Sequence, residues 1–121
     1  MIAGVGCDII EIERIENLLE KDGFLKRCFT ASEIEYFEKR KWNAQSVAAG
    51  FAAKAAVSKA LGTGISGFSM KDIEILHDEK GKPNAVLHSG AAELADKLSA
   101  KVFVSMSHTD KLAMAYAVLD S

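Results

Sequence analysis

The sequence has few of the residues that hold small proteins together through covalent bonds or metal ions. Its two cysteines, Cys7 and Cys28, are too few for a disulfide scaffold and form no C-x-x-C pair, so we expect reduced thiols and no structural zinc. No apolar run approaches the length of a transmembrane helix. The first residues lack the basic segment and cleavage site of a signal peptide, so we expect a cytoplasmic protein. A formal net charge of −2 argues against general nucleic-acid binding.

Acidic residues are missing from one long stretch of the chain. Between Lys39 and Lys71 there are six lysines and arginines and no aspartate or glutamate. The rest of the chain holds the other nine of the 15 basic residues and all 17 acidic ones. A protein that is slightly acidic overall therefore concentrates positive charge in one segment. Such a segment suits an anionic ligand, such as a phosphate, or an acidic protein partner.

The first half of the chain predicts one strand followed by three helices. The segment 2–10 contains several β-branched residues and two glycines, which is typical of a buried strand. An amphipathic helix follows, and Gly23 is expected to end it. A capping box from Thr30 to Glu33 opens a helix to about Arg40. Residues 44–61 then predict a long central helix that is apolar nearly all round.

The second half of the chain predicts strands joined mostly by hairpins. We expect a strand around Ile73 and Ile75, a strand at 85–88, a helix at 90–99, and strands at 101–107 and 112–119. The 121 residues are the length of one domain, spanning 1–121. We therefore predict an α+β fold in which a mainly antiparallel sheet packs against the long helix.

Charged residues in apolar elements are the first candidates for a site. Asp8 ends an apolar strand, where an unpaired carboxylate is costly. It is either a Mg²⁺ ligand or, as is commoner at a strand end, a cap for the helix that starts near Glu11. Lys54 and Lys59 are the only charged residues of the long helix, and Ser58 is an i, i+4 neighbour of Lys54. Each lysine reaches toward solvent or contacts an anionic ligand.

Glycines and histidines give weaker signals. The stretch from Gly62 to Gly67 matches G-x-G-x-x-G, but it follows a helix, whereas the dinucleotide fingerprint follows a strand and opens a helix. We therefore reject a Rossmann site and predict a helix end whose backbone amides can hold a phosphate. His108 lies in a polar turn, as a solvated residue or a base. His77 and His88 have no partner at ligand spacing and are interpreted as structural.

Several blocks of the sequence together resemble the holo-[acyl-carrier-protein] synthase family, the short bacterial 4′-phosphopantetheinyl transferases. The resemblance covers the whole chain. The blocks occur in the family's order and spacing: Gly4-Val-Gly-Cys-Asp8, Phe29-Thr-Ala-Ser-Glu33, Phe51-Ala-Ala-Lys54, Ser58-Lys-Ala-Leu-Gly-Thr-Gly64, Asp72-Ile-Glu-Ile75, Gly81-Lys-Pro83 and Val104-Ser-Met-Ser-His-Thr109. It implies an enzyme that moves 4′-phosphopantetheine from coenzyme A to a serine of apo-acyl carrier protein and releases adenosine 3′,5′-bisphosphate.

The resemblance also implies roles for individual residues. Asp8 would bind Mg²⁺ against the pyrophosphate, Lys59 would contact phosphate, and both would be catalytic together with His108. The coenzyme site would include these further residues: Lys54, Ser58, Gly62, Thr63, Gly64, Lys82, Pro83 and Thr109. The helix carrying Arg14 would face the acidic carrier protein. The family forms homotrimers with active sites between subunits, so a homotrimer is expected here.

Three positions depart from the family pattern. Ala55 stands where the family has a glutamate that supplies a second metal carboxylate, Gly50 replaces an arginine, and Phe103 replaces a histidine. Alanine offers no oxygen to a metal, so we expect lower metal affinity and activity in an intact helix, unless a nearby acid such as Glu11 substitutes. The alternatives are a protein that binds coenzyme A or acyl carrier protein without turnover, and an oligomeric scaffold with a basic surface.

Overall fold

The computed structural model describes residues 1–121. Its elements in chain order are β1 (Ile2–Glu11), α1 (Ile12–Leu19), α2 (Phe24–Cys28), α3 (Ala31–Lys39), α4 (Ala44–Ala60), a 3₁₀ turn η1 (Met70–Asp72), β2 (Ile73–His77), β3 (Pro83–Leu87), α5 (Ser89–Lys97), β4 (Lys101–His108) and β5 (Leu112–Asp120). One sheet has three strands in the order β1-β5-β4, the other is the β2-β3 hairpin, and all pairs are antiparallel. The α+β class with antiparallel sheets is therefore confirmed.

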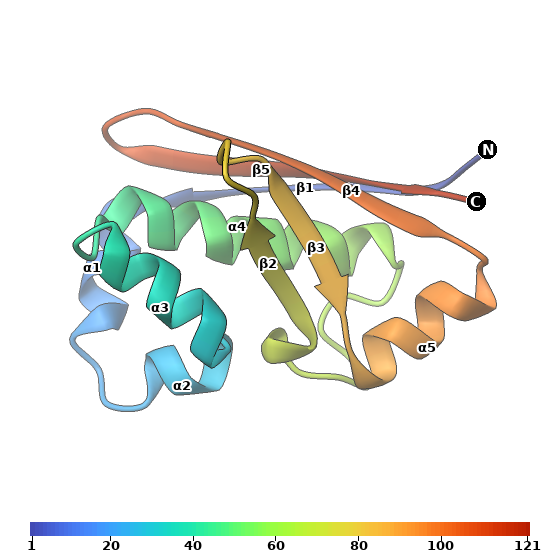
Figure 1. The fold of residues 1–121 in the computed structure, drawn as a ribbon, viewed down its shortest axis with the longest axis horizontal. Coiled ribbons are helices and arrows are strands. Elements are labelled where there is room, and N and C mark those ends of the chain that lie inside the picture. Colours follow the sequence, from blue (N-terminus) through green and yellow to red (C-terminus); the bar gives the residue numbers. More distant parts are fainter.

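Helix α4 lies along the inner face of the three-stranded sheet (Figure 1). Eleven of its 17 residues are buried, most of them alanine. Small side chains let the sheet approach closely: a Cβ added to Gly4 would lie 2.2 Å from the Ala60 carbonyl oxygen, and one added to Gly6 2.1 Å from that of Ala56. These two glycines therefore fix where β1 crosses α4. None of the helices is long and apolar enough to cross a membrane.

The β2-β3 hairpin lies beside the middle of α4, and helices α1, α2 and α3 lie near the first turns of α4 (Figure 1). The predicted capping box at the start of α3 is confirmed: the Glu33 amide donates to Thr30 Oγ1 at 3.3 Å, and the Thr30 amide donates to Glu33 Oε1 at 2.9 Å. The prediction for Gly23 is wrong. Helix α1 ends at Leu19, with Glu20 as its C-cap, and Gly23, with φ of 82°, precedes α2 instead.

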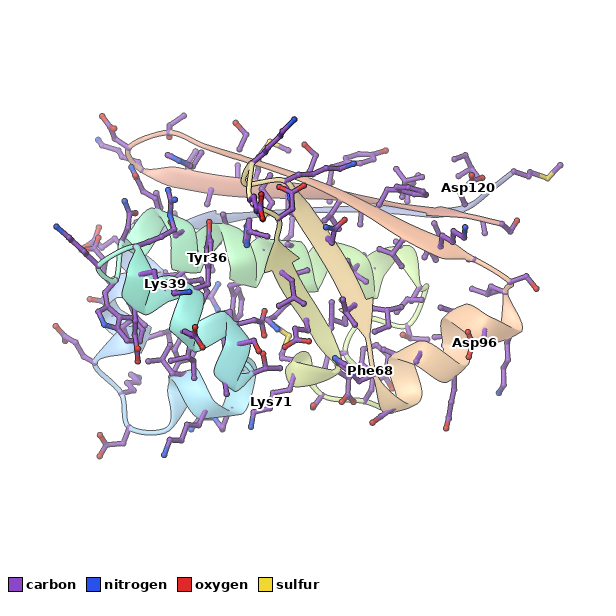
Figure 2. All side chains as sticks on the ribbon, viewed as in Figure 1. Tyr36, Lys39, Phe68, Lys71, Asp96 and Asp120 are labelled. Atoms are coloured by element: carbon purple, nitrogen blue, oxygen red, sulfur yellow. The ribbon has the colours of Figure 1, made fainter.

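Strand β1 was predicted to be buried, but one of its faces is open. Its even-numbered residues face α4, while the odd-numbered ones point outward with Val5 53% and Ile9 63% exposed. The register aligns them with outward residues of β5 and β4. The resulting apolar surface, here called the outer sheet face, comprises Val5, Cys7, Ile9, Phe103, Met114, Tyr116 and Val118. Side chains project from this side of the sheet, away from α4 (Figure 2). An apolar strand pattern alone does not tell whether the second face is covered by the same chain.

Candidate functional site

Asp8 and Lys59 form an ion pair between the sheet and the last turn of α4. Lys59 Nζ donates to Asp8 Oδ1 at 3.1 Å and to the Cys7 carbonyl oxygen at 3.0 Å. The Lys59 side chain is 55% exposed and that of Asp8 21% exposed, so both are accessible to a ligand. The capping alternative for Asp8 is excluded, because the residue that precedes α1 is Glu11 and no side chain caps this helix. The structure therefore brings two of the predicted catalytic residues into contact.

Ala55 lies one helical turn before Lys59 on the same side of α4 and is partly exposed. Its methyl group supplies no oxygen to a cation near Asp8. Glu11 does not substitute: it is outward-facing on β1 and lines clefts with Ile12, Arg14 and Leu112 that contain neither Asp8 nor Lys59. The chain has no group of three or more His, Cys, Asp or Glu side chains able to hold a metal ion. These donors do not fit a Mg²⁺ ion held by the protein alone, because one carboxylate is available and Lys59 contacts one of its oxygens.

The glycine turn follows Lys59 in the chain and closes the end of α4. Gly62 and Gly64 have φ of 86° and 59°, and nothing lies close to the position of a Cβ atom at either residue. The positive φ therefore explains why both residues are glycine, and a lack of space does not. Their amides donate to the Lys59 and Ser58 carbonyl oxygens, which closes the end of α4. The Thr63 amide makes no hydrogen bond within the chain, and neither do the amides of Ile65 and Gly67, so this stretch has free donors. Ser58 is buried, and its hydroxyl donates to the Ala55 carbonyl oxygen at 2.7 Å.

Lys54 requires a correction, because the structure places it in the core. Its side chain is 0% exposed, and Nζ donates to Glu33 Oε1 at 2.7 Å, to the Ile73 carbonyl oxygen at 2.6 Å and to that of Met70 at 3.1 Å. All three donors of the ammonium are used, so Lys54 has none left for a coenzyme. Burial lowers the pKa of Lys54, and the Glu33 carboxylate opposes that shift. No residue close to Lys54 in the chain indicated this contact, since Glu33 lies 21 residues earlier.

A second group of predicted residues gathers at the other end of α4. His108 ends β4, and a cleft of about 170 Å³ joins it to Gly81 of the β2-β3 turn, with Lys82 and Pro83 next in sequence. Several hydrogen bonds hold Thr109: its carbonyl oxygen accepts from Gln45 Nε2 at 3.4 Å, its hydroxyl accepts from the Leu112 amide at 3.1 Å, and its amide donates to the Leu112 carbonyl oxygen at 2.8 Å. The β2-β3 turn and the end of β4 therefore line the same cleft.

Tyr36 and Arg40 are among the residues of this cleft that sequence reasoning missed. Arg40 lies over the Tyr36 ring and donates through Nε to Ser46 Oγ at 3.1 Å. Tyr36 stacks on His77 with centroids 4.0 Å apart. Burial lowers the pKa of His77, and the charge of Arg40 adds to the shift. The available signal was that Arg40 belongs to the basic stretch that begins at Lys39.

The two groups do not meet within one chain. In the sheet, Asp8 pairs with Ala115 and His108 with Ala113, so they are two strands and two residues apart, or roughly 12 Å between Cα atoms. The basic stretch is not one patch either: Lys54 is buried, and Lys39 on α3 and Lys71 on η1 lie at separate places (Figure 2). Arg14 is exposed on α1 beside Ile9 and Leu112. Each chain thus carries the predicted site residues in two separate groups.

Comparisons with known proteins agree with the resemblance. The family model of the 4′-phosphopantetheinyl transferase superfamily matches residues 4–117. A holo-[acyl-carrier-protein] synthase from Clostridium perfringens is 52% identical, with 99% of this chain and 95% of that protein covered. One from Clostridium acetobutylicum is 48% identical, with 99% and 98% covered.

Solved structures show the same similarity over the whole fold. The holo-[acyl-carrier-protein] synthase of Neisseria meningitidis superposes with a TM-score of 0.90 at 34% identity, with both chains fully covered. That of Bacillus anthracis, in complex with CoA (3′,5′-ADP), has a TM-score of 0.83 at 39% identity, covering 100% of this chain and 98% of that one. The chain therefore belongs to the 4′-phosphopantetheinyl transferase superfamily and, within it, to the holo-[acyl-carrier-protein] synthases, which are transferases.

Proposed function

We propose that this protein transfers 4′-phosphopantetheine from coenzyme A to a serine of apo-acyl carrier protein, releasing adenosine 3′,5′-bisphosphate. The observation that carries the proposal is the Asp8–Lys59 pair beside the glycine turn, in a chain whose full length matches this family. Related structures hold coenzyme A or 3′,5′-ADP, which supports coenzyme A as the substrate.

The reaction forms a bond between the serine oxygen and the phosphorus that carries pantetheine. It breaks the pyrophosphate bond, and the serine hydroxyl loses its proton. Negative charge grows on the departing phosphate, so positioning and electrostatic stabilisation do most of the work. The exposed Lys59 ammonium and the free Thr63 amide are the donors on this side of the site. Gly62 and Gly64 give the turn its shape, and Ser58 supports it from within α4.

A homotrimer would unite the two groups of predicted site residues. The outer sheet face is a contiguous apolar surface, and exposed surfaces of this kind mark sites of association. His108, Thr109, Lys82 and Pro83 of one subunit would then bind the nucleotide end of a coenzyme whose pyrophosphate lies at Asp8 and Lys59 of its neighbour. Light scattering of the purified protein tests this assembly, since three chains of 13.0 kDa each are expected. A monomer that transfers at full rate would contradict it.

The acyl carrier protein is expected to dock beside Arg14. Arg14 is exposed on α1 beside the outer sheet face and lines a cleft with Glu11 and the apolar Ile9 and Leu112. An acidic carrier would be attracted to the Arg14 cation and would cover Leu112.

A second candidate function is binding of coenzyme A or acyl carrier protein without turnover. Ala55 favours it, because the position that supplies a carboxylate in the family carries a methyl group here. We would incubate the protein with apo-acyl carrier protein, coenzyme A and Mg²⁺ and weigh the carrier by mass spectrometry. A Mg²⁺-dependent gain of one phosphopantetheine supports transfer. Saturable binding of coenzyme A with no gain in mass would favour the binding protein.

A further inference from the structure

Asp8 is the only carboxylate that the chain directs toward Lys59. Its neighbours across the sheet are Ala115 on β5 and, beyond that, Met106 on β4, neither of which carries an oxygen in its side chain. From α4, the residue one turn before Lys59 is Ala55. A divalent cation at Asp8 would therefore find one carboxylate from the protein, where Mg²⁺ takes six oxygen ligands.

The same carboxylate already has a counter-ion. Lys59 Nζ lies 3.1 Å from Asp8 Oδ1, and its second contact, with the Cys7 carbonyl oxygen at 3.0 Å, fixes the ammonium against the strand. A cation that approached Asp8 in the absence of substrate would have to displace a positive charge or lie beside one. Both are unfavourable, since like charges at such distances repel.

A bound coenzyme changes this balance. Its pyrophosphate brings negative charge and several oxygens, which give Lys59 a second anion to contact and give a divalent cation the ligands that the protein lacks. The argument rests on the proposed function, because it requires the pyrophosphate to lie at Asp8 and Lys59.

We infer that the coenzyme-free protein has no divalent cation site: Lys59 is the counter-ion of Asp8, and the cation enters together with the pyrophosphate of coenzyme A. Binding of cation and coenzyme is then mutually dependent, and by linkage each raises the affinity for the other by the same factor. Replacing Ala55 with glutamate would convert this arrangement into a preformed site.

Mn²⁺ serves as the probe, and its free concentration is followed by electron paramagnetic resonance. We expect no saturable binding of Mn²⁺ to the coenzyme-free protein and saturable binding once coenzyme A is present, above the amount that coenzyme A alone retains. Asp8→Asn should abolish the additional binding. Ala55→Glu should show saturable binding of Mn²⁺ without coenzyme, because it adds a second carboxylate, and Ala55→Gln, of matched size and no charge, should not. Circular dichroism checks that each variant is folded.

The outcomes separate the inference from the proposed function. Saturable Mn²⁺ binding by the coenzyme-free parent chain that Asp8→Asn removes would overturn the inference and leave the transferase intact. Binding of coenzyme A that recruits no Mn²⁺ would overturn it as well. A failure to bind coenzyme A, with Mn²⁺ or without, would overturn the proposed function and the inference with it.

Discussion

Two lysines five residues apart on α4 have opposite environments. Lys54 is fully buried, with all three ammonium donors bound to Glu33 and the carbonyl oxygens of Met70 and Ile73. Lys59 is more than half exposed and pairs with Asp8 at the edge of the glycine turn. The same residue type thus anchors η1 and β2 to the helix at one position and leaves an exposed charge beside Asp8 at the other. Burial and the partner decide the role.

The largest expected effect is on stability, and it separates the two lysines. Lys54→Met leaves the Glu33 carboxylate buried without its cation, so we expect the free energy of unfolding to fall by about 3–5 kcal/mol. Lys59→Met removes a pair at the surface and should change it by no more than about 1 kcal/mol. Urea denaturation followed by circular dichroism measures both. Equal losses in the two variants would contradict the comparison.

The double variant Glu33→Leu with Lys54→Met sharpens this test. Replacing both partners removes the uncompensated charge, so a substantial part of the stability lost in Lys54→Met should return. No recovery would mean that the loss comes from the ammonium's contacts with Met70 and Ile73, and that the ion pair itself contributes little.

The second effect is on catalysis, where Lys59, the lysine with the smaller effect on stability, is expected to matter. Lys59→Met should lower kcat/KM for phosphopantetheine transfer by about 10²–10³-fold, the usual cost of losing one donor that stabilises charge in a transition state. Lys71→Met is the matched control, because Lys71 is exposed and makes no ion pair. Transfer to apo-acyl carrier protein is followed by mass spectrometry. An unchanged rate in Lys59→Met would show that this ammonium does not contact the reacting phosphate.

A smaller gain is expected at Ala55. Ala55→Glu adds a carboxylate beside Asp8 and should raise Mg²⁺-dependent transfer by about tenfold or more at limiting Mg²⁺, because a second ligand tightens the cation. Ala55→Gln controls for side-chain size. The rate is measured across a Mg²⁺ titration. If the glutamate gives no gain at any Mg²⁺ concentration, the family's second carboxylate has no use in this chain.

Local patterns in the sequence predicted much of the fold. The capping box at Thr30 and Glu33, the apolar character of the α4 segment and the hairpins of the second half all depend on near neighbours in the chain, and the structure contains each of them. The pairing of Asp8 with Lys59 was not predicted as a contact, although both residues were selected. Their contact joins positions 51 residues apart.

The failures share a physical cause, which is that the local sequence does not specify what a residue contacts or which element it borders. Lys54 was assigned to a ligand because its partner Glu33 precedes it by 21 residues. Strand β1 was predicted to be buried because an apolar face looks the same whether this chain or a second subunit covers it. Gly23 was placed at the end of α1 because a glycine with positive φ serves equally well in the turn before α2.

The smallest effect extends the comparison to two histidines. His77 stacks on Tyr36 with Nδ1 buried and unpaired, whereas His108 is exposed in the turn. Burial, reinforced by Arg40 and opposed by Asp78, lowers the pKa of His77 below its ordinary value of 6.5. Between the folded pKa and 6.5 the unfolded chain binds more protons, so stability should fall as the pH drops through this window.

In His77→Phe, the ring that stacks on Tyr36 remains and the proton is lost, so this component of the pH dependence should vanish. His108→Phe should leave it in place. Urea midpoints between pH 5 and 7.5 measure the difference. If the parent chain and His77→Phe lose stability in parallel over that range, another group causes the pH dependence. His77 and His108 would then not differ in their effect on stability, although the Nδ1 of His77 is buried and His108 is exposed.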